Sequence, residues 1–250
     1  MPSWNVHIAH AEDLLKRHSP QELGINDWNA FLLGCLLPDV YVGYMVQPLS
    51  KKLPYRMTHL ADTSKVPLPD YETFAARYVY GQDTQDTQDA QDTRDKQDPQ
   101  DARGTQAAHA GAADAAHDLI LGTWCHLMAD HTYNAHTRVY LAEHHIPRGE
   151  KARIGKQGDL QLFGQTFDLH SHIEIDSALL AQAHAFPAYE INDCDLYTTS
   201  KIVDNIVKEN AQAHLDATPA YTMLDQAFFE EAFEELKSLM ERNLFEACGA

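Results

Sequence analysis

The chain has 250 residues, of which 44% are hydrophobic, enough for a substantial core and consistent with a single domain. Acidic residues outnumber lysine and arginine by 37 to 19, and the formal net charge of -18 disfavours nonspecific binding to duplex nucleic acid or an anionic bilayer. The four cysteines lack CxxC spacing, and neither an apolar leader nor a run of eighteen apolar residues occurs, so we expect reduced thiols, no transmembrane segment and a cytoplasmic protein.

Two helices are predicted near the N-terminus. The spacing of apolar residues predicts the first over residues 7–17. A second, almost wholly apolar helix is capped by Asn26 or Asp27 and stopped by Pro38. Asp39 therefore follows a buried helix, and it is either a solvent-facing loop residue or a ligand delivered to an interior site.

The next part of the chain is predicted to be mostly loop. Residues 40–69 are rich in tyrosine and proline and have no sustained period, which indicates a long structured loop with one short helix. His59 lies in this loop. Asp70 is expected to cap a short helix that ends at Gly81.

A repeat of glutamine and aspartate interrupts the domain. It has a three-residue period and no large apolar side chain, so residues 82–106 are predicted to be a disordered, solvated insertion. Residues 1–81 and 107–250 are then two parts of one domain.

The strongest chemical signal lies in the apolar stretch 119–136, LILGTWCHLMADHTYNAH. His126 and Asp130 stand four residues apart, so on a helix they project from one face and can close on a single cation. A buried carboxylate or imidazole without compensation is costly, and such groups are usually paired or bound to metal. The alternative is a hydrogen-bonded core histidine beside an aspartate that caps the next helical turn.

The C-terminal part is predicted from simpler patterns. Residues 148–159 are polar and basic and are expected to form a loop, followed by a short hairpin over 160–167. Two further helices are predicted over 198–214 and 221–248. The second has an acidic outer face and an apolar stripe that serves packing.

A helix is also predicted to follow Asp168, in the segment LHSHIEIDSALLAQA. It repeats the four-residue spacing twice, as His170 with Glu174 and as His172 with Asp176. Because positions two apart lie on roughly opposite sides of a helix, only one pair can face a common site.

Eight histidine and acidic side chains from distant parts of the chain form one pattern. They supply imidazoles and carboxylates without cysteine, a ligand mix suited to zinc in hydrolytic sites. The set comprises His7, Asp39, His59, His126, Asp130, His136, His170 and Glu174.

The segments that carry this pattern resemble the zinc-dependent phospholipase C family, which is related to the single-strand-specific zinc nucleases. HLMADHTYNAH is similar to the family's H-x3-D-x5-H, and HSHIE is similar to its H-x3-E. GCLLPD and THL occur in the expected order. The resemblance implies an all-α, single-domain multi-helix bundle with two or three zinc ions in a cleft.

The resemblance also implies which residues hold each ion. One ion would be surrounded by Asp39, His59, His126 and Asp130. A second would be held by His136, His170 and Glu174. Asp130 would bridge to a third ion that His7 helps to bind.

The chain departs from the family pattern at its start. Secreted members use a processed N-terminal tryptophan as a metal ligand, whereas Trp4 is internal in this sequence. The third ion is therefore expected to be absent, weakly held or bound by other groups, of which His10 is a candidate.

The expected reaction is hydrolysis of a phosphodiester, with a small phosphoester or a phospholipid head group as substrate. Asp39 is the candidate general base. Tyr41, Tyr44 and Tyr55 are expected to shape the substrate pocket. No protein partner is inferred.

Two alternatives remain open. The first is a histidine-aspartate nucleotide phosphohydrolase, although that class has an adjacent His-Asp pair and here Asp130 precedes His131. The second is a metal-binding helical protein without catalysis, in which the cluster holds helices together.

Overall fold

The computed structural model describes residues 2–61, 68–81 and 115–249, and within these ranges it is helical and contains no strand. The all-α prediction is therefore confirmed, whereas the predicted insertion at 82–106 lies outside the described residues. The elements are α1 (Trp4–Arg17), η1 (Pro20–Leu23), α2 (Trp28–Gly34), α3 (Leu37–Val42), α4 (Tyr55–Thr58), α5 (Tyr71–Phe74), η2 (Ala75–Val79), α7 (His117–Glu143), α8 (Glu150–Gly164), α9 (Ser177–Ala185), α10 (Asp193–Gln212) and α11 (Gln226–Gly249).

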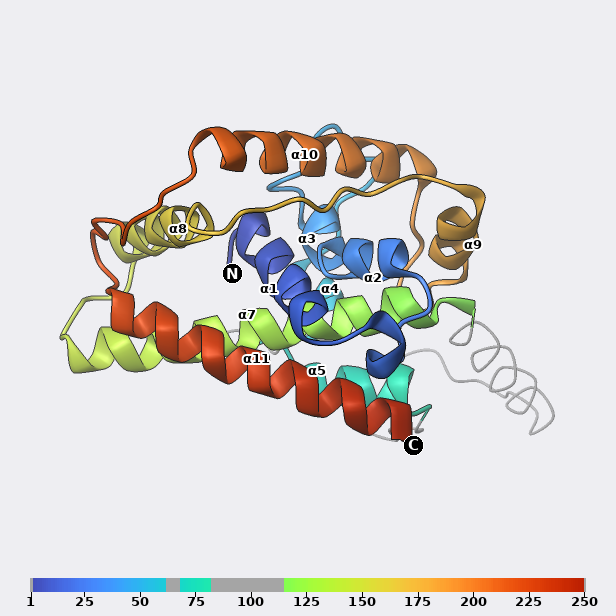
Figure 1. Ribbon diagram of the computed structural model, residues 1–250, viewed down its shortest axis with the longest axis horizontal. Helices are drawn as coiled ribbons and strands as arrows, with labels where there is room; N and C mark the ends of the chain where they lie inside the picture. The colour runs from blue at the N-terminus through green and yellow to red at the C-terminus, as the bar shows by residue number, and fades with distance from the viewer. Residues whose placement is uncertain (1, 62–67, 82–114, 250) are drawn as a thin grey trace, which may run out of the picture.

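The long helix α7 runs through the middle of the fold, and most of its residues are buried (Figure 1). It makes its largest contacts with α2 and with α11, which runs beside it. Helix α1 contacts α8, α10 and α11, so it is enclosed from several sides. Most of its residues are buried as a result, polar ones included. None of the helices in the described ranges is both long and apolar enough to span a membrane.

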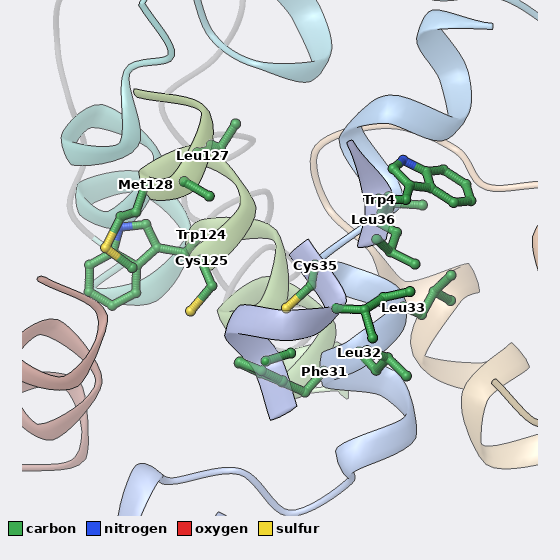
Figure 2. Packing of buried hydrophobic residues seen from close by; sticks show 14 of the residues in the cluster. Trp4, Phe31, Leu32, Leu33, Cys35, Leu36, Trp124, Cys125, Leu127 and Met128 are labelled. Atoms are coloured by element: carbon green, nitrogen blue, oxygen red, sulfur yellow. The ribbon is translucent and has the colours of Figure 1, made fainter. Parts of the chain in front are cut away.

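Two glycines allow α2 and α7 to cross at very short range. A Cβ atom added to Gly122 would lie 2.0 Å from the carbonyl oxygen of Phe31, and one added to Gly34 would lie 2.4 Å from that of Leu119. Figure 2 shows Phe31 and Cys35 on one side of this crossing and residues of α7 on the other. The close approach brings the backbone that follows α2 against the middle of α7.

Four carboxylates with little or no exposure hold loops against the helices. Each accepts hydrogen bonds from backbone N–H groups, which compensates for the removal of its charge from water. Glu12 accepts hydrogen bonds from the N–H groups of residues 170 and 171, and Asp118 accepts them from residues 26 and 27. Asp159 accepts from the N–H groups of residues 222 to 224, and Asp195 accepts from that of residue 50.

Several local predictions are confirmed. Asp27 caps α2 by accepting hydrogen bonds from two backbone N–H groups, and Asp70 caps α5 by accepting one from the backbone N–H of Thr73. The two C-terminal helices are present as α10 and α11. Pro38, however, does not simply end a helix: it lies in the first turn of α3, where its missing N–H is tolerated. Asp39 consequently sits on a helix and not in a loop.

The predicted loop at 148–159 and the predicted hairpin at 160–167 are both wrong. Helix α8 spans them, with Ala152, Leu160 and Phe163 buried along its length. The lysine, arginine, glutamine and leucine residues of this segment favour helix, and that preference outweighs its glycines.

The helix predicted to follow Asp168 is also wrong at its start, because α9 begins only at Ser177 and is capped by Asp176. Residues 168–176 are not helical. Leu169 and Ile173 are buried whereas the intervening histidines are exposed, an alternation typical of extended chain.

Candidate metal centre

Five of the eight predicted ligand side chains converge in the interior. His7 comes from α1, Asp39 from the first turn of α3, His59 from the C-terminal end of α4, and His126 and Asp130 from α7. Each is at most 3% exposed. Four segments of the chain therefore contribute to one buried cluster.

Local sequence explains how four of these side chains reach the cluster. His126 and Asp130 are one turn apart on α7 and share a face. Pro38 begins α3 and so directs Asp39 from its first turn. His59 ends α4 and is followed by Leu60, whose φ of 49° turns the chain away.

The polar atoms of the cluster lie within a few ångströms of one another. His59 Nε2 is 3.2 Å from His126 Nε2 and 3.4 Å from Asp130 Oδ2. His59 Nε2 also lies 3.7 Å from Asp39 Oδ1, and His7 Nε2 lies 3.6 Å from Asp130 Oδ1. The rings of His7 and His126 stack at 4.2 Å. Two groups could hold an ion, His7 with Asp39 and His126, and His59 with His126 and Asp130.

Hydrogen bonds behind the imidazoles fix which ring nitrogen faces the cluster. His126 Nδ1 donates to the carbonyl oxygen of Cys35 at 2.8 Å, because a carbonyl can only accept. The hydroxyl of Thr58 lies 2.7 Å from His59 Nδ1 and orients that ring from behind. His126 therefore presents the lone pair of its Nε2 to the cluster, 3.2 Å from His59 Nε2. A second ring nitrogen that is hydrogen-bonded in this way is typical of metal-ligating histidine.

Three buried atoms in the cluster have no hydrogen-bond partner among the described residues. They are His7 Nε2, Asp39 Oδ1 and Asp130 Oδ1. Leaving such acceptors unpaired costs about 1–3 kcal/mol each, and more when they are charged. All three are metal-ligand types, so the donor set fits a divalent cation.

Burial dominates the acid-base properties of the cluster. It raises the pKa of Asp39, reinforced by the nearby Asp130 carboxylate, and it lowers the pKa of both His59 and His126. Burial would also raise the pKa of Asp130, but its neighbours, His59 and His7 among them, hold that pKa well below the usual range. The lowered pKa values favour the neutral, metal-ligating form of His59 and His126.

Tyr55 is the one predicted pocket tyrosine that contacts the cluster. Its ring stacks on His59 at 3.9 Å and its hydroxyl donates to Asp130 Oδ2 at 3.1 Å. It is half-buried, so it lies between the cluster and solvent. Tyr41 is instead buried and accepts a hydrogen bond from the backbone of residue 192, and Tyr44 is 79% exposed.

The other three predicted ligands do not join the cluster. His136 Nε2 pairs with a carboxylate oxygen of Glu235 on α11 at 2.8 Å. His170 and Glu174 are exposed on the extended segment before α9, where they line a surface groove of about 560 Å³ with Trp28. The helical spacing that would have aligned them is absent because that segment is not helical.

His10, the candidate substitute ligand, is also engaged elsewhere. Its Nε2 lies 3.0 Å from the hydroxyl of Tyr133, and its ring stacks on Phe233. Sequence reasoning missed the groups that orient the imidazoles. Thr58 immediately precedes His59 and offered a local signal, whereas the backbone carbonyl of Cys35 has no signature in a sequence.

Fold and site together define an all-helical protein with a buried histidine-carboxylate cluster of metal-ligand type. No family model, curated protein or solved structure matches this chain. The cluster itself is therefore the feature that bears on function.

Proposed function

We propose that the protein is a zinc-dependent hydrolase of phosphodiesters, similar in chemistry to a phospholipase C. One observation carries the proposal: the Nε2 atoms of two imidazoles face each other at 3.2 Å beside two carboxylates, deep in the interior. Imidazole and carboxylate without thiolate is the ligand mix of hydrolytic zinc sites.

Each residue of the cluster has a role in this proposal. His59, His126 and Asp130 would hold the ion, and a divalent cation so placed supplies Lewis-acid stabilisation of charge on phosphate oxygens and makes water more acidic. Asp39 is the general base, because burial raises its pKa well above the usual range and makes the carboxylate a better acceptor of a proton from water. Tyr55 keeps Asp130 oriented through its hydroxyl.

The test combines metal analysis with turnover of a chromogenic phosphodiester. We expect bound zinc, activity that is lost on chelation and restored by zinc, and loss of both zinc and activity in Asp130→Asn. Asp216→Asn, at a side chain that is 99% exposed, is the matched control and should retain both. Wild-type protein that carries zinc but hydrolyses no phosphoester would contradict the hydrolase proposal.

Burial of the cluster favours a second candidate, a metal ion that only joins helices α1, α3 and α7. Its ligands are almost completely enclosed, as in structural metal sites, and zinc without turnover would support it. The histidine-aspartate phosphohydrolase alternative has less support. His131 bonds to the carbonyl of Pro69 and packs edge-on against Tyr71, away from Asp130.

A further inference from the structure

The number of ions that the cluster can hold follows from its donors. His126 Nδ1 is committed to the carbonyl of Cys35, so this ring offers one nitrogen, Nε2, to a metal. Both candidate groups need that nitrogen, the one with His7 and Asp39 and the one with His59 and Asp130. An imidazole nitrogen has one lone pair and binds one ion. The two groups are therefore alternatives and cannot be filled together.

Ring geometry and distances favour the group of His59, His126 and Asp130. The rings of His7 and His126 are stacked with planes 6° apart, so their in-plane lone pairs do not converge on one ion. With zinc–nitrogen bonds of about 2.0–2.1 Å, two ligands of a tetrahedral ion lie about 3.3 Å apart. His59 Nε2 is 3.2 Å from His126 Nε2 and 3.4 Å from Asp130 Oδ2, so these ligands already have that spacing. Asp39 Oδ1, at 3.7 Å from His59 Nε2, lies just outside it.

We infer that the cluster binds one divalent ion per chain, held by His59, His126 and Asp130, and not the two or three ions that its resemblance to zinc-dependent phospholipases implies. The inference rests on the proposed metal site. In this arrangement Asp39 and His7 lie beside the ion but are not essential ligands. Asp39 is then free to act as a base.

The experiment is a metal count on the full-length protein. Chelator-stripped protein is titrated with zinc in the presence of a competing chelator that prevents binding to exposed histidines, and the zinc-to-protein ratio is measured by mass spectrometry. We expect a ratio of about one. A ratio of two overturns this inference but leaves the proposed metal site standing, whereas a ratio of zero removes both.

Variants assign the ligands independently of activity. Asp130→Asn should weaken zinc binding at least about 100-fold, whereas Asp39→Asn should keep one ion with affinity within about 10-fold of wild type. Both are close in shape to the native residue, and circular dichroism confirms that each folds. His170→Ala, at an exposed histidine, is the control and should change neither count nor affinity. Loss of the ion in Asp39→Asn with retention in Asp130→Asn would overturn the assignment.

Discussion

Replacing Gly122 with alanine perturbs the crossing of α2 and α7 directly. The new Cβ would lie 2.0 Å from the carbonyl oxygen of Phe31 and 2.9 Å from the amide nitrogen of Cys35. Ordinary contacts of carbon begin near 3.5 Å, so the helices would have to separate by about 1.5 Å. Both clashing atoms belong to the backbone and cannot rotate away.

The magnitude comes from two opposing effects. Forcing an extra methyl group into a packed interior costs about 1–3 kcal/mol, and the upper end applies because backbone is met on the far side. Alanine gains about 1 kcal/mol over glycine in helix propensity. We therefore expect Gly122→Ala to lower the free energy of unfolding by about 2 kcal/mol.

Urea unfolding of metal-free protein measures this difference, since bound metal would add its own stabilisation. Gly158→Ala is the matched control: Gly158 lies in helix α8, is exposed, and a Cβ there would meet nothing within 4 Å. It should raise stability by about 0.5–1 kcal/mol. If Gly122→Ala is as stable as wild type while the control behaves as expected, the tight crossing is refuted.

Three other perturbations have defined outcomes. Tyr55→Phe keeps the stacked ring but removes the hydroxyl that serves Asp130, and should cost about 1–3 kcal/mol in urea unfolding of metal-free protein; no loss would contradict the bond. Burial, aided by His7, lowers the pKa of His10 in the folded protein. Below about pH 6.5 the His10 imidazole is therefore protonated in the unfolded chain but not in the folded one. The free energy of unfolding should fall as the pH drops below that value, by up to about 1.4 kcal/mol per pH unit. His10→Gln should show a shallower decline between pH 6.5 and 5 in the same assay. Asp159→Ala removes the acceptor of four hydrogen bonds and should cost at least about 3 kcal/mol by thermal unfolding, whereas the exposed Asp216→Ala should change stability by less than about 0.5 kcal/mol.

The part of the site that lies on regular helix could be predicted from the sequence. The four-residue spacing of His126 and Asp130 places both on one face, and the apolar residues around them predict burial; both expectations are confirmed. Asp39 was expected either in a loop or at an interior site, and the structure places it inside, on α3.

What could not be predicted depends on long-range contacts. The segment before α9 carries two competing patterns. Leu169 and Ile173 are buried, Ser171 and Ile175 are partly buried, and the residues between them are exposed, as in extended chain. His170 and Glu174 have helical spacing, and tertiary contacts decide between the two patterns. Here Glu12 accepts hydrogen bonds from the backbone of residues 170 and 171 and holds this segment extended. Neither that contact nor the meeting of Gly34 with Gly122 leaves a local periodic signal.

All five cluster residues precede residue 131, so the chain that follows Asp130 supplies no ligand among them. During synthesis, every one of these residues is added to the chain before helices α8 to α11. Helices α8 to α11 pack against α1 and α7 and contribute none of the five side chains. Substitutions in these later helices can therefore change stability and surface charge without removing a ligand of the cluster.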